Sequence, residues 1–371
     1  MSDRVRVALI FGGDSPEHGV SCLTAASVLA AIDKDRYEVI GIGITQSGRW
    51  TQVSHEQIAG YRIVDAQVPR VAEDTPEAVW LWNGSECEVA TRDGDTLRDI
   101  RRIDVAFALL HGPFGEDGTI QGLFEMAGVR YVGSGVAASA NGMDKHLMKV
   151  MFESVGLPVW PYVAFDALRW RDERDQVLAE IGALSYPLYV KPSRGGSSLG
   201  ISRVTGQDGL IEAIAHAQHF DPKVIVEQGF TGAREIECAV LGDPDVPGGC
   251  RASLTGEIRV VKDGGFYDFE AKYIAEDQAE LDVPADLPDE ISSKVRELAR
   301  QAFRAMGAEG LARVDTFVTP DGEVWLNEIN TMPGFTRISM YPALWQASGV
   351  SYPDLVGRLV ELALARPLGL R

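Results

Sequence analysis

Hydrophobic and polar positions along the first third of the chain follow two alternating periods. Apolar runs of strand length and apolar runs with helical spacing succeed one another at residues 5–11, 20–32, 39–44, 104–110 and 119–126. Strands that alternate with helices predict a parallel sheet covered by helices. Residues 54–99 lie between these runs and are polar and irregular, with Trp80 and Trp82 on a predicted hairpin. We interpret this stretch as an insertion.

From Met143 onward the pattern changes to one in which hairpins mix with helices. A helix that carries Lys145 and Lys149 leads into predicted elements at residues 159–165, 169–183, 187–191, 199–204, 211–219 and 223–227. In the last third, predicted strands and helices occupy residues 235–241, 257–261, 288–306, 312–318, 324–329 and 353–365. An acidic, loop-like stretch at 262–281 interrupts them. The sequence therefore predicts an α/β unit followed by α+β structure.

Composition limits the possible partners. The chain has 371 residues, 35 Lys+Arg and 54 Asp+Glu, and a net charge of −19. This length predicts two or three domains. A strongly acidic protein is not expected to bind nucleic acid or an anionic membrane, but a local cluster of lysines can still bind phosphate. The apolar run at 20–32 is shorter than the roughly 18–20 residues that a membrane span needs. A soluble, cytoplasmic protein is expected.

The four cysteines do not form a C-x-x-C pair, so neither a zinc site nor a dithiol redox centre is expected. Buried thiols are the expected state.

Two neighbouring strands of the last third carry candidate metal ligands. Arg313 and Asp315 are two apart and therefore lie on one face of their strand, as Glu328 and Asn330 do on the next. Carboxylate and amide oxygens are ligands that Mg²⁺ and Mn²⁺ prefer, with phosphates completing the shell. A solvated strand face is the alternative, but these acids interrupt apolar runs, where an uncompensated carboxylate is costly to bury. The pattern favours a metal site.

A glycine-rich segment follows another strand at residues 191–200 (KPSRGGSSLG). Glycines allow close approach of the backbone to a ligand, and successive N–H groups and hydroxyls can bind phosphate. The segment is not a Walker A loop, because Lys191 precedes the glycines and no helix is predicted after them. A flexible hairpin tip is the alternative. Lys145 and Lys191 would supply cations for ATP phosphates.

The loop after the first strand reads GGDSPEHG, which is not the G-x-G-x-x-G fingerprint of a dinucleotide site. Glu17 and His18 stand just before a predicted helix, a position that suits a charged small molecule. A simple partner of the helix dipole is the alternative for Glu17. His111 ends a strand, where open α/β sheets place ligands.

Together these motifs resemble D-alanine–D-alanine ligases, members of the ATP-grasp family of carboxylate–amine ligases. The matching stretches are residues 11–21 (FGGDSPEHGVS), 110–122 (LHGPFGEDGTIQG), 143–145 (MDK), 190–200 (VKPSRGGSSLG), 267–273 (YDFEAKY), 310–315 (GLARVD) and 327–341 (NEINTMPGFTRISMY). The resemblance implies a Rossmann-like N-terminal domain at 1–142, with its insertion, followed by a two-part ATP-grasp fold at 143–233 and 234–371. It also implies a homodimer.

The resemblance assigns roles to individual residues. On the nucleotide side it implies two Mg²⁺ or Mn²⁺ ions on Asp315, Glu328 and Asn330, and ATP contacts from Lys145, Lys191, Ser197, Glu227, Phe230, Glu235 and Lys272. On the substrate side it implies D-alanine contacts from Glu17, His111, Ser339 and Met340, and catalytic roles for Glu17, Ser197, Tyr273, Arg313, Gly334 and Ser339. One departure is Gly19, where relatives carry a larger residue, and it is expected to loosen the loop around Glu17.

The implied reaction makes D-alanyl-D-alanine for peptidoglycan through an acyl phosphate. The alternatives are a D-alanine–D-lactate ligase or another ATP-grasp carboxylate–amine ligase, which share most of these motifs. The pair Lys272 and Tyr273 favours the dipeptide enzyme. A catalytically silent nucleotide-binding protein would be expected to have lost some of Asp315, Glu328, Asn330 and Arg313, and all four are present.

Overall fold

The first sheet has the parallel order that the hydrophobic pattern predicts. The computed structural model describes residues 4–83, 86–260 and 279–368. The strand order is β3-β2-β1-β7-β8, and β3 alone in this sheet is antiparallel to its neighbour. The strands are β1 (Val5–Gly12), β2 (Tyr37–Ile44), β3 (Trp50–Gln52), β7 (Val105–Ala108) and β8 (Arg130–Tyr131).

Both faces of this sheet are buried, which explains why its strands are almost continuously apolar. Along β1, Val7 and Leu9 enter one core, and Ala8 and Ile10 enter the other. Helices α1 (His18–Ala31) and α12 (Tyr352–Ala365) contribute to the first core, and α3 (Thr119–Ala127) to the second. The expected doubly covered sheet is confirmed.

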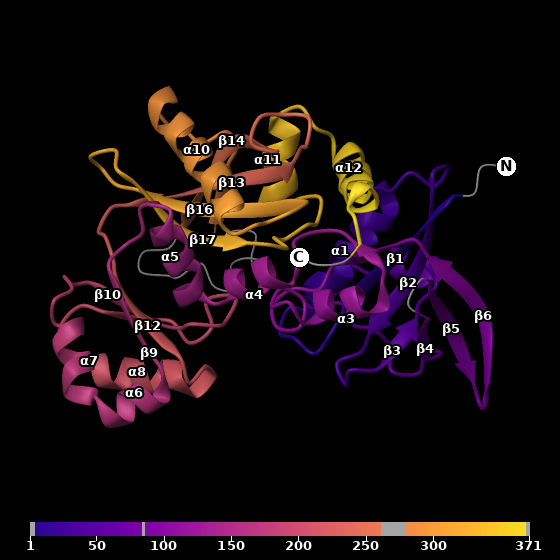
Figure 1. Ribbon diagram of the computed structural model, residues 1–371, viewed down its shortest axis with the longest axis horizontal. Helices are drawn as coiled ribbons and strands as arrows, with labels where there is room; N and C mark the ends of the chain where they lie inside the picture. The colour runs from indigo at the N-terminus through magenta and orange to yellow at the C-terminus, as the bar shows by residue number, and fades with distance from the viewer. Residues whose placement is uncertain (1–3, 84–85, 261–278, 369–371) are drawn as a thin grey trace.

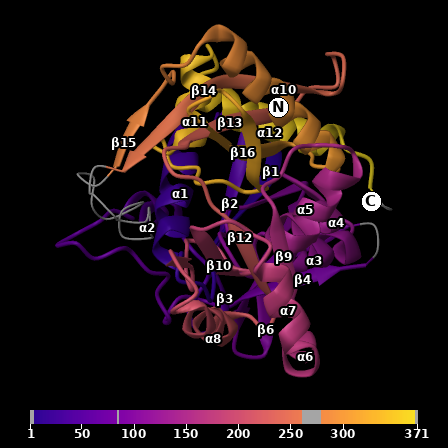
Figure 2. The same ribbon diagram turned by 90° about the vertical axis from the view of Figure 1, so that its left-hand side faces the viewer.

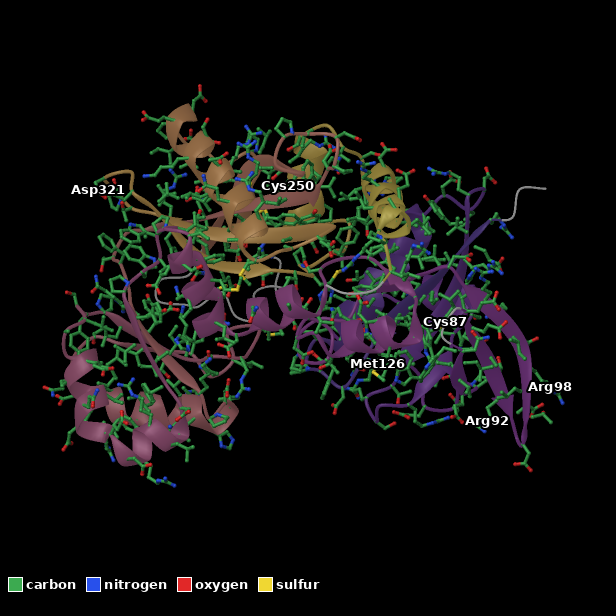
Figure 3. The ribbon with its side chains drawn as sticks, in the orientation of Figure 1. Cys87, Arg92, Arg98, Met126, Cys250 and Asp321 are labelled. Atoms are coloured by element: carbon green, nitrogen blue, oxygen red, sulfur yellow. The ribbon has the colours of Figure 1, made fainter. Side chains whose placement is uncertain are left out.

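The interpretation of residues 54–99 as irregular is wrong for much of its length. A short helix α2 (His55–Ala59) is followed by a three-stranded antiparallel sheet with the order β4-β5-β6. Its strands are β4 (Ala78–Trp82), β5 (Cys87–Asp93) and β6 (Thr96–Ile103). The predicted hairpin around Trp80 and Trp82 is confirmed as β4 paired with β5. Figure 3 shows Arg92 and Arg98 at the outer part of this sheet, where they project away from the body of the molecule.

The middle of the chain forms an antiparallel sheet with the order β11-β10-β12-β9. Its strands are β9 (Tyr162–Phe165), β10 (Leu188–Pro192), β11 (Ser202–Val204) and β12 (Val224–Gln228). The nearby helices are α4 (Val136–Met143), α5 (Lys145–Ser154), α6 (Ala167–Asp172), α7 (Arg174–Ile181) and α8 (Leu210–Phe220). The single helix predicted at 169–183 is wrong, because the chain leaves helical geometry at Glu173 (φ −126°, ψ 30°).

The third sheet has the order β15-β14-β13-β16-β17 and is antiparallel throughout. Its strands are β13 (Arg234–Gly242), β14 (Cys250–Val260), β15 (Ala279–Asp282), β16 (Leu311–Val318) and β17 (Val324–Asn330). Helix α10 (Asp289–Ala305) packs on one face together with α5, whose Met148 and Phe152 enter the same core. Helix α11 (Met340–Ala347), which the sequence pattern did not predict, packs on β13 and β14.

The first and third sheets share a hydrophobic core. Helix α12 leaves the third unit and contacts α1, β7 and β8 of the first, as the yellow helix beside α1 shows in Figure 1. The rings of Phe107 and Phe335 meet edge to face with centroids 6.0 Å apart. The middle sheet has a separate core. Each sheet falls within one predicted domain, and the domain boundaries remain predictions.

All four cysteines are free and buried, as expected. Burial raises the pKa of the Cys22 thiol to about 12 and that of the Cys87 thiol to about 11, so neither is reactive at neutral pH. Figure 3 shows Cys87 and Cys250 far apart, in the first and third units. No helix in the described part of the chain is long and apolar enough to cross a membrane.

Candidate active site

A cleft of about 1440 Å³ lies where the three units meet. Figure 2 shows the third sheet above β10 and β12 of the middle sheet, with the first sheet behind them. The predicted site residues that line the cleft are Glu17, His111, Lys145, Lys191, Ser197, Glu227, Phe230, Glu235, Arg313, Glu328, Asn330, Gly334, Ser339 and Met340. Asp315 lies just beneath this lining and is buried. Lys272 and Tyr273 lie outside the described residues.

The candidate metal ligands meet through strand register. Strands β16 and β17 pair Asp315 with Glu328 and Arg313 with Asn330. Arg313 donates to both oxygens of Asp315 at 2.7 Å, and the Asn330 amide donates to Asp315 Oδ2 at 3.0 Å. The predicted juxtaposition of these four side chains is confirmed.

Glu237 belongs to the same cluster, although sequence reasoning missed it. It lies opposite Asp315 on β13, is buried, and its Oε2 is 3.0 Å from Arg313 Nε. Burial opposes the charge on Arg313, but Asp315 and Glu237 outweigh it and raise the Arg313 pKa well above its usual value. The signal that could have found Glu237 is a lone acid in the apolar strand segment IECAV.

The donor set of this cluster fits a hard divalent cation. Asp315 and Glu328 supply carboxylate oxygens, and Asn330 supplies an amide oxygen once its side chain is turned toward the ion. Among the residues described, no group of three His, Cys, Asp or Glu side chains is arranged to hold a metal ion. Two carboxylates and an amide therefore need phosphate oxygens to complete a coordination shell, and Asp315 must exchange part of its contact with Arg313 for the ion.

Two lysines, Lys145 and Lys191, line the cleft, and a third, Lys149, is buried next to it. Lys191 Nζ is 2.7 Å from Glu227 Oε2, and Lys149 Nζ is 3.4 Å from Glu227 Oε1. Burial alone would raise the pKa of Glu227, but Lys149 and Lys191 lower it to about 2. Lys145 Nζ donates to the Gly195 carbonyl at 2.8 Å and lies 3.8 Å from Glu328 Oε2. A positive site thus stands beside the candidate metal ligands.

The glycine-rich segment connects β10 to β11 without a helix, as predicted. Ser197 and Ser198 adopt left-handed backbone conformations (φ 51° and 58°), which are uncommon outside glycine. This geometry aims the Ser197 hydroxyl at the N-terminal unit, where it donates to Glu17 Oε1 at 2.7 Å. Two residues 180 positions apart thus meet across the cleft.

Sequence reasoning also missed the partner of His111. Its Nδ1 lies 3.2 Å from the Met332 carbonyl and 3.7 Å from Glu116 Oε1. Glu116 lines the cleft, and burial raises its pKa. His18, by contrast, is structural, because Nδ1 bonds the Gly13 carbonyl at 2.7 Å and Nε2 accepts from the Val71 N–H at 3.0 Å.

The expectation that Gly19 loosens the loop around Glu17 is wrong. Gly19 is buried in the first turn of α1, and a Cβ atom built there would lie 2.4 Å from the Val68 side chain. The glycine therefore permits close packing of the 61–70 segment on α1.

An aromatic stack in the cleft includes Phe230, one of the predicted ATP contacts. Phe230 stacks on Trp160 at 4.9 Å, and Trp160 stacks on Trp325 at 4.8 Å. Ser339, which also lines the cleft, precedes α11, and its Oγ lies 2.7 Å from Thr336 Oγ1. Trp160 was not predicted as a site residue, since nothing in its local sequence distinguishes it from a core aromatic.

Comparison with known proteins gives consistent matches over the whole chain. The family model for the D-Ala–D-Ala ligase N-terminus matches residues 6–134, and that for the C-terminus matches residues 151–361. A D-alanine–D-alanine ligase of Kineococcus radiotolerans is 54% identical and aligns with 99% of this chain and 98% of its own. A second, of Mycobacterium ulcerans, is 49% identical over 100% of this chain and 98% of its own.

Two solved structures are similar over the whole fold. A VanG D-Ala:D-Ser ligase from Enterococcus faecalis superposes with a TM-score of 0.82 at 33% identity, covering 97% of this chain and 100% of its own. The D-alanine–D-alanine ligase from Coxiella burnetii gives a TM-score of 0.80 at 30% identity, covering 98% and 95%. Such D-Ala ligases have the ATP-grasp fold, which this chain therefore shares.

Proposed function

The chain belongs to the D-alanine–D-alanine ligase family and forms D-alanyl-D-alanine for peptidoglycan synthesis, and we propose that ATP drives this reaction in the cleft described above. The observation that carries the proposal is the meeting of two kinds of site in one cleft. Lys145 and Lys191 stand beside the Asp315–Glu328 pair, and the Glu17–Ser197 pair lies across from them. The first group suits a polyphosphate with its cations, and the second suits an amino acid.

In the first step the carboxylate of one D-alanine attacks the γ-phosphorus of ATP. A P–O bond forms to the carboxylate, the bond to ADP breaks, and the acyl phosphate results. We assign Glu17 to the ammonium of this D-alanine, because an ionised carboxylate accepts all the hydrogen bonds that an ammonium donates. Lys145 and Lys191 hold phosphate oxygens, and Arg313 balances charge that spreads over the transferring group.

Asp315, Glu328 and Asn330 would hold two Mg²⁺ or Mn²⁺ ions, which neutralise the phosphates and orient them for in-line transfer. Glu227 and Phe230 are assigned to the adenine, and Glu235 to the ribose. These assignments follow the family resemblance, and Glu227, Phe230, Glu235, Glu328 and Asn330 line the cleft.

In the second step the amine of another D-alanine attacks the carbonyl carbon of the acyl phosphate. The ammonium first gives up a proton to solvent, its nitrogen lone pair forms the C–N bond, and phosphate then leaves with the electrons of the C–O bond. Arg313 and the Gly334 N–H are assigned to the developing oxyanion. Ser339 and Met340 border this part of the cleft, and Ser197 with Glu17 closes its other side.

The test is ADP release by the purified protein, measured with D-alanine, D-lactate, D-serine or L-alanine as substrate. We expect D-alanine together with Mg²⁺ or Mn²⁺ to be required, and L-alanine to be inert. Equal turnover in EDTA or with L-alanine would refute the proposal. Release that depends on D-alanine but gives mainly the ester with D-lactate, or mainly the mixed product with D-serine, would assign the chain to a ligase of different acceptor specificity.

A homodimer and a cytoplasmic location are expected of this family and stay predictions for this chain. Sedimentation equilibrium of the full chain would measure the first, and fractionation of cells that express it would measure the second.

A further inference from the structure

Lys149 is a fully buried lysine that has no role in the reaction as described. Its side chain is 0% exposed at the middle of α5, and its Nζ atom makes no hydrogen bond of good geometry. Its Nζ atom lies 3.4 Å from Glu227 Oε1 and 5.9 Å from the centroid of the Tyr162 ring. Removing an ammonium from water is costly, and an apolar side chain of similar length would avoid that cost. A functional reason for the charge is therefore worth seeking.

The two lysines on Glu227 differ in their access to the cleft. Lys191 Nζ holds Oε2 at 2.7 Å and lines the cleft, with 12% of its side chain exposed. Lys149 Nζ lies 3.4 Å from Glu227 Oε1, but its side chain is fully buried and is not part of the cleft lining. One carboxylate thus has one counter-ion that a ligand can reach and one that it cannot.

The two lysines also come from different parts of the fold. Lys191 and Glu227 lie on adjacent strands of the middle sheet. Lys149 lies on α5, where its neighbour Met148 packs into the core of the third sheet. Lys149 therefore fixes the Glu227 carboxylate relative to the sheet that carries the candidate metal ligands.

We infer that Lys149 is a positioning residue for nucleotide recognition, the buried counter-ion that holds Glu227 in place when Lys191 turns to the phosphates. The inference rests on the proposed function, because it takes Lys191 and Glu227 as nucleotide contacts. Held in this way, Glu227 presents an ionised carboxylate, which only accepts hydrogen bonds. The carboxylate therefore favours a base whose edge facing Glu227 carries an amino group, and it repels a base that has a carbonyl oxygen at the same place.

The experiment measures binding of ADP and of IDP, which carries a carbonyl in place of the adenine amine, by titration calorimetry in MgCl₂ without D-alanine. The variants are Lys149→Met and, as a matched control, Lys294→Met at an exposed lysine on α10. We expect Lys149→Met to weaken ADP binding by at least about tenfold and IDP binding by less than about threefold, and Lys294→Met to change neither. Equal weakening of both nucleotides would overturn the inference.

A second comparison separates positioning from direct contact. If Lys149 acts through Glu227, adding Lys149→Met to Glu227→Gln should change ADP affinity by less than about twofold. A further tenfold loss would overturn the inference. This comparison also tests the inference if Lys149→Met alone does not fold. The Glu227→Gln variant and the double variant both lack the Glu227 carboxylate, so neither leaves that charge buried without Lys149.

Because binding is measured without D-alanine, the proposed function is tested separately. A wild-type chain that binds ADP and fails to ligate D-alanine would refute the proposed function and leave this test intact.

Discussion

At the scale of single residues, each of three carboxylates in the site has a partner that a ligand can replace. Arg313 forms an ion pair with Asp315, Lys191 forms one with Glu227, and the neutral Ser197 hydroxyl donates a hydrogen bond to Glu17. The two ion pairs keep buried charge balanced until a ligand binds. Glu328, whose Oε2 lies 3.8 Å from Lys145 Nζ, is one of the more solvent-exposed carboxylates of the site.

Replacing Glu328 with Gln should therefore abolish most activity and leave the fold intact. We expect ADP release to fall roughly 100-fold or more, the scale of losing a group that stabilises transition-state charge. The melting temperature without ligands should stay unchanged or rise slightly, because one carboxylate is removed from an acidic cluster. Glu323→Gln, at an exposed acid before β17, is the control. A near-normal rate for Glu328→Gln at saturating Mg²⁺ would mean that the acid belongs to an ordinary solvated strand face.

Gly19 gives a test of packing at the same scale. Gly19→Ala adds a Cβ atom against Val68, and overpacking of this kind costs roughly 1–3 kcal/mol. Gly357→Ala in α12 is the matched control, since nothing lies within 4 Å of the added atom. It should stabilise the protein by about 0.5–1 kcal/mol, the helix preference for Ala over Gly. Urea unfolding of both variants measures the difference, and equal shifts of the same sign would contradict the packing argument.

At the scale of elements, the start of α5 shows how a cap can serve more than its own helix. Asp144 accepts from the backbone N–H groups of His146 and Leu147, and also from Ser193 Oγ at 2.7 Å and Lys223 Nζ at 2.8 Å. One carboxylate thereby ties α5 to two strand ends of the middle sheet. The lysine that positions Glu227 stands one turn further along the same helix.

Asp144→Ala should cost about 3–5 kcal/mol of stability, because it leaves Lys223 without its nearly buried partner. Asp166→Ala, at the exposed cap of α6, should cost only about 1 kcal/mol. Burial opposes ionisation of Asp144, but Lys223 and Ser193 outweigh it and lower its pKa. Its contribution is thus present above the unfolded pKa of about 3.9 and is lost as pH falls below that value. Chemical unfolding at pH 7 and at pH 3 measures both effects, and an Asp144→Ala penalty that persists undiminished at pH 3 would contradict this account.

A helix or strand could be predicted from the sequence where the pattern of apolar residues within its own segment is sufficient to identify it. Strands β1, β2, β7, β13, β16 and β17 were predicted to within two residues at each end, because unbroken apolar runs need no neighbour to explain them. Only the end of β14 was predicted, β3 and β8 were missed, and β15 begins within the stretch 262–281 that was predicted as loop-like. Strand β6 was missed because its side chains are mostly exposed and charged, and α11 because it is short and contains Pro342. Glu116, Glu237 and Lys149 were missed as site residues for a different reason. Their importance comes from partners that only the fold brings near.

At the scale of the whole molecule, one hydrophobic core joins residues of two different sheets. One core joins the first sheet, α11, α12 and the side chains around Phe335, whereas the middle sheet has a core of its own around Val177. The first and third units should therefore behave as one body in unfolding.

Phe335→Ala should cost about 3–5 kcal/mol and affect both of those units. Hydrogen exchange should accelerate in β1 as well as in β13, although the substituted residue is more than 300 positions from β1. Val177→Ala should instead accelerate exchange only in the middle sheet and its helices. Peptide-resolved hydrogen exchange would detect either pattern, and acceleration confined to the third unit in Phe335→Ala would refute the shared core.

The position of α12 has a consequence for synthesis of the protein on the ribosome. Domains of a growing chain ordinarily fold in order, from the N-terminus. Here Val7 and Leu9 of the first strand pack in the same core as Leu355 and Leu359, which are translated more than 340 residues later. The part of the N-terminal sheet that α12 covers must therefore stay exposed until α12 has been translated, although α1 already packs on the same face. During that interval the nascent chain exposes apolar side chains of the N-terminal sheet, and it depends on another molecule, such as a chaperone, to cover them.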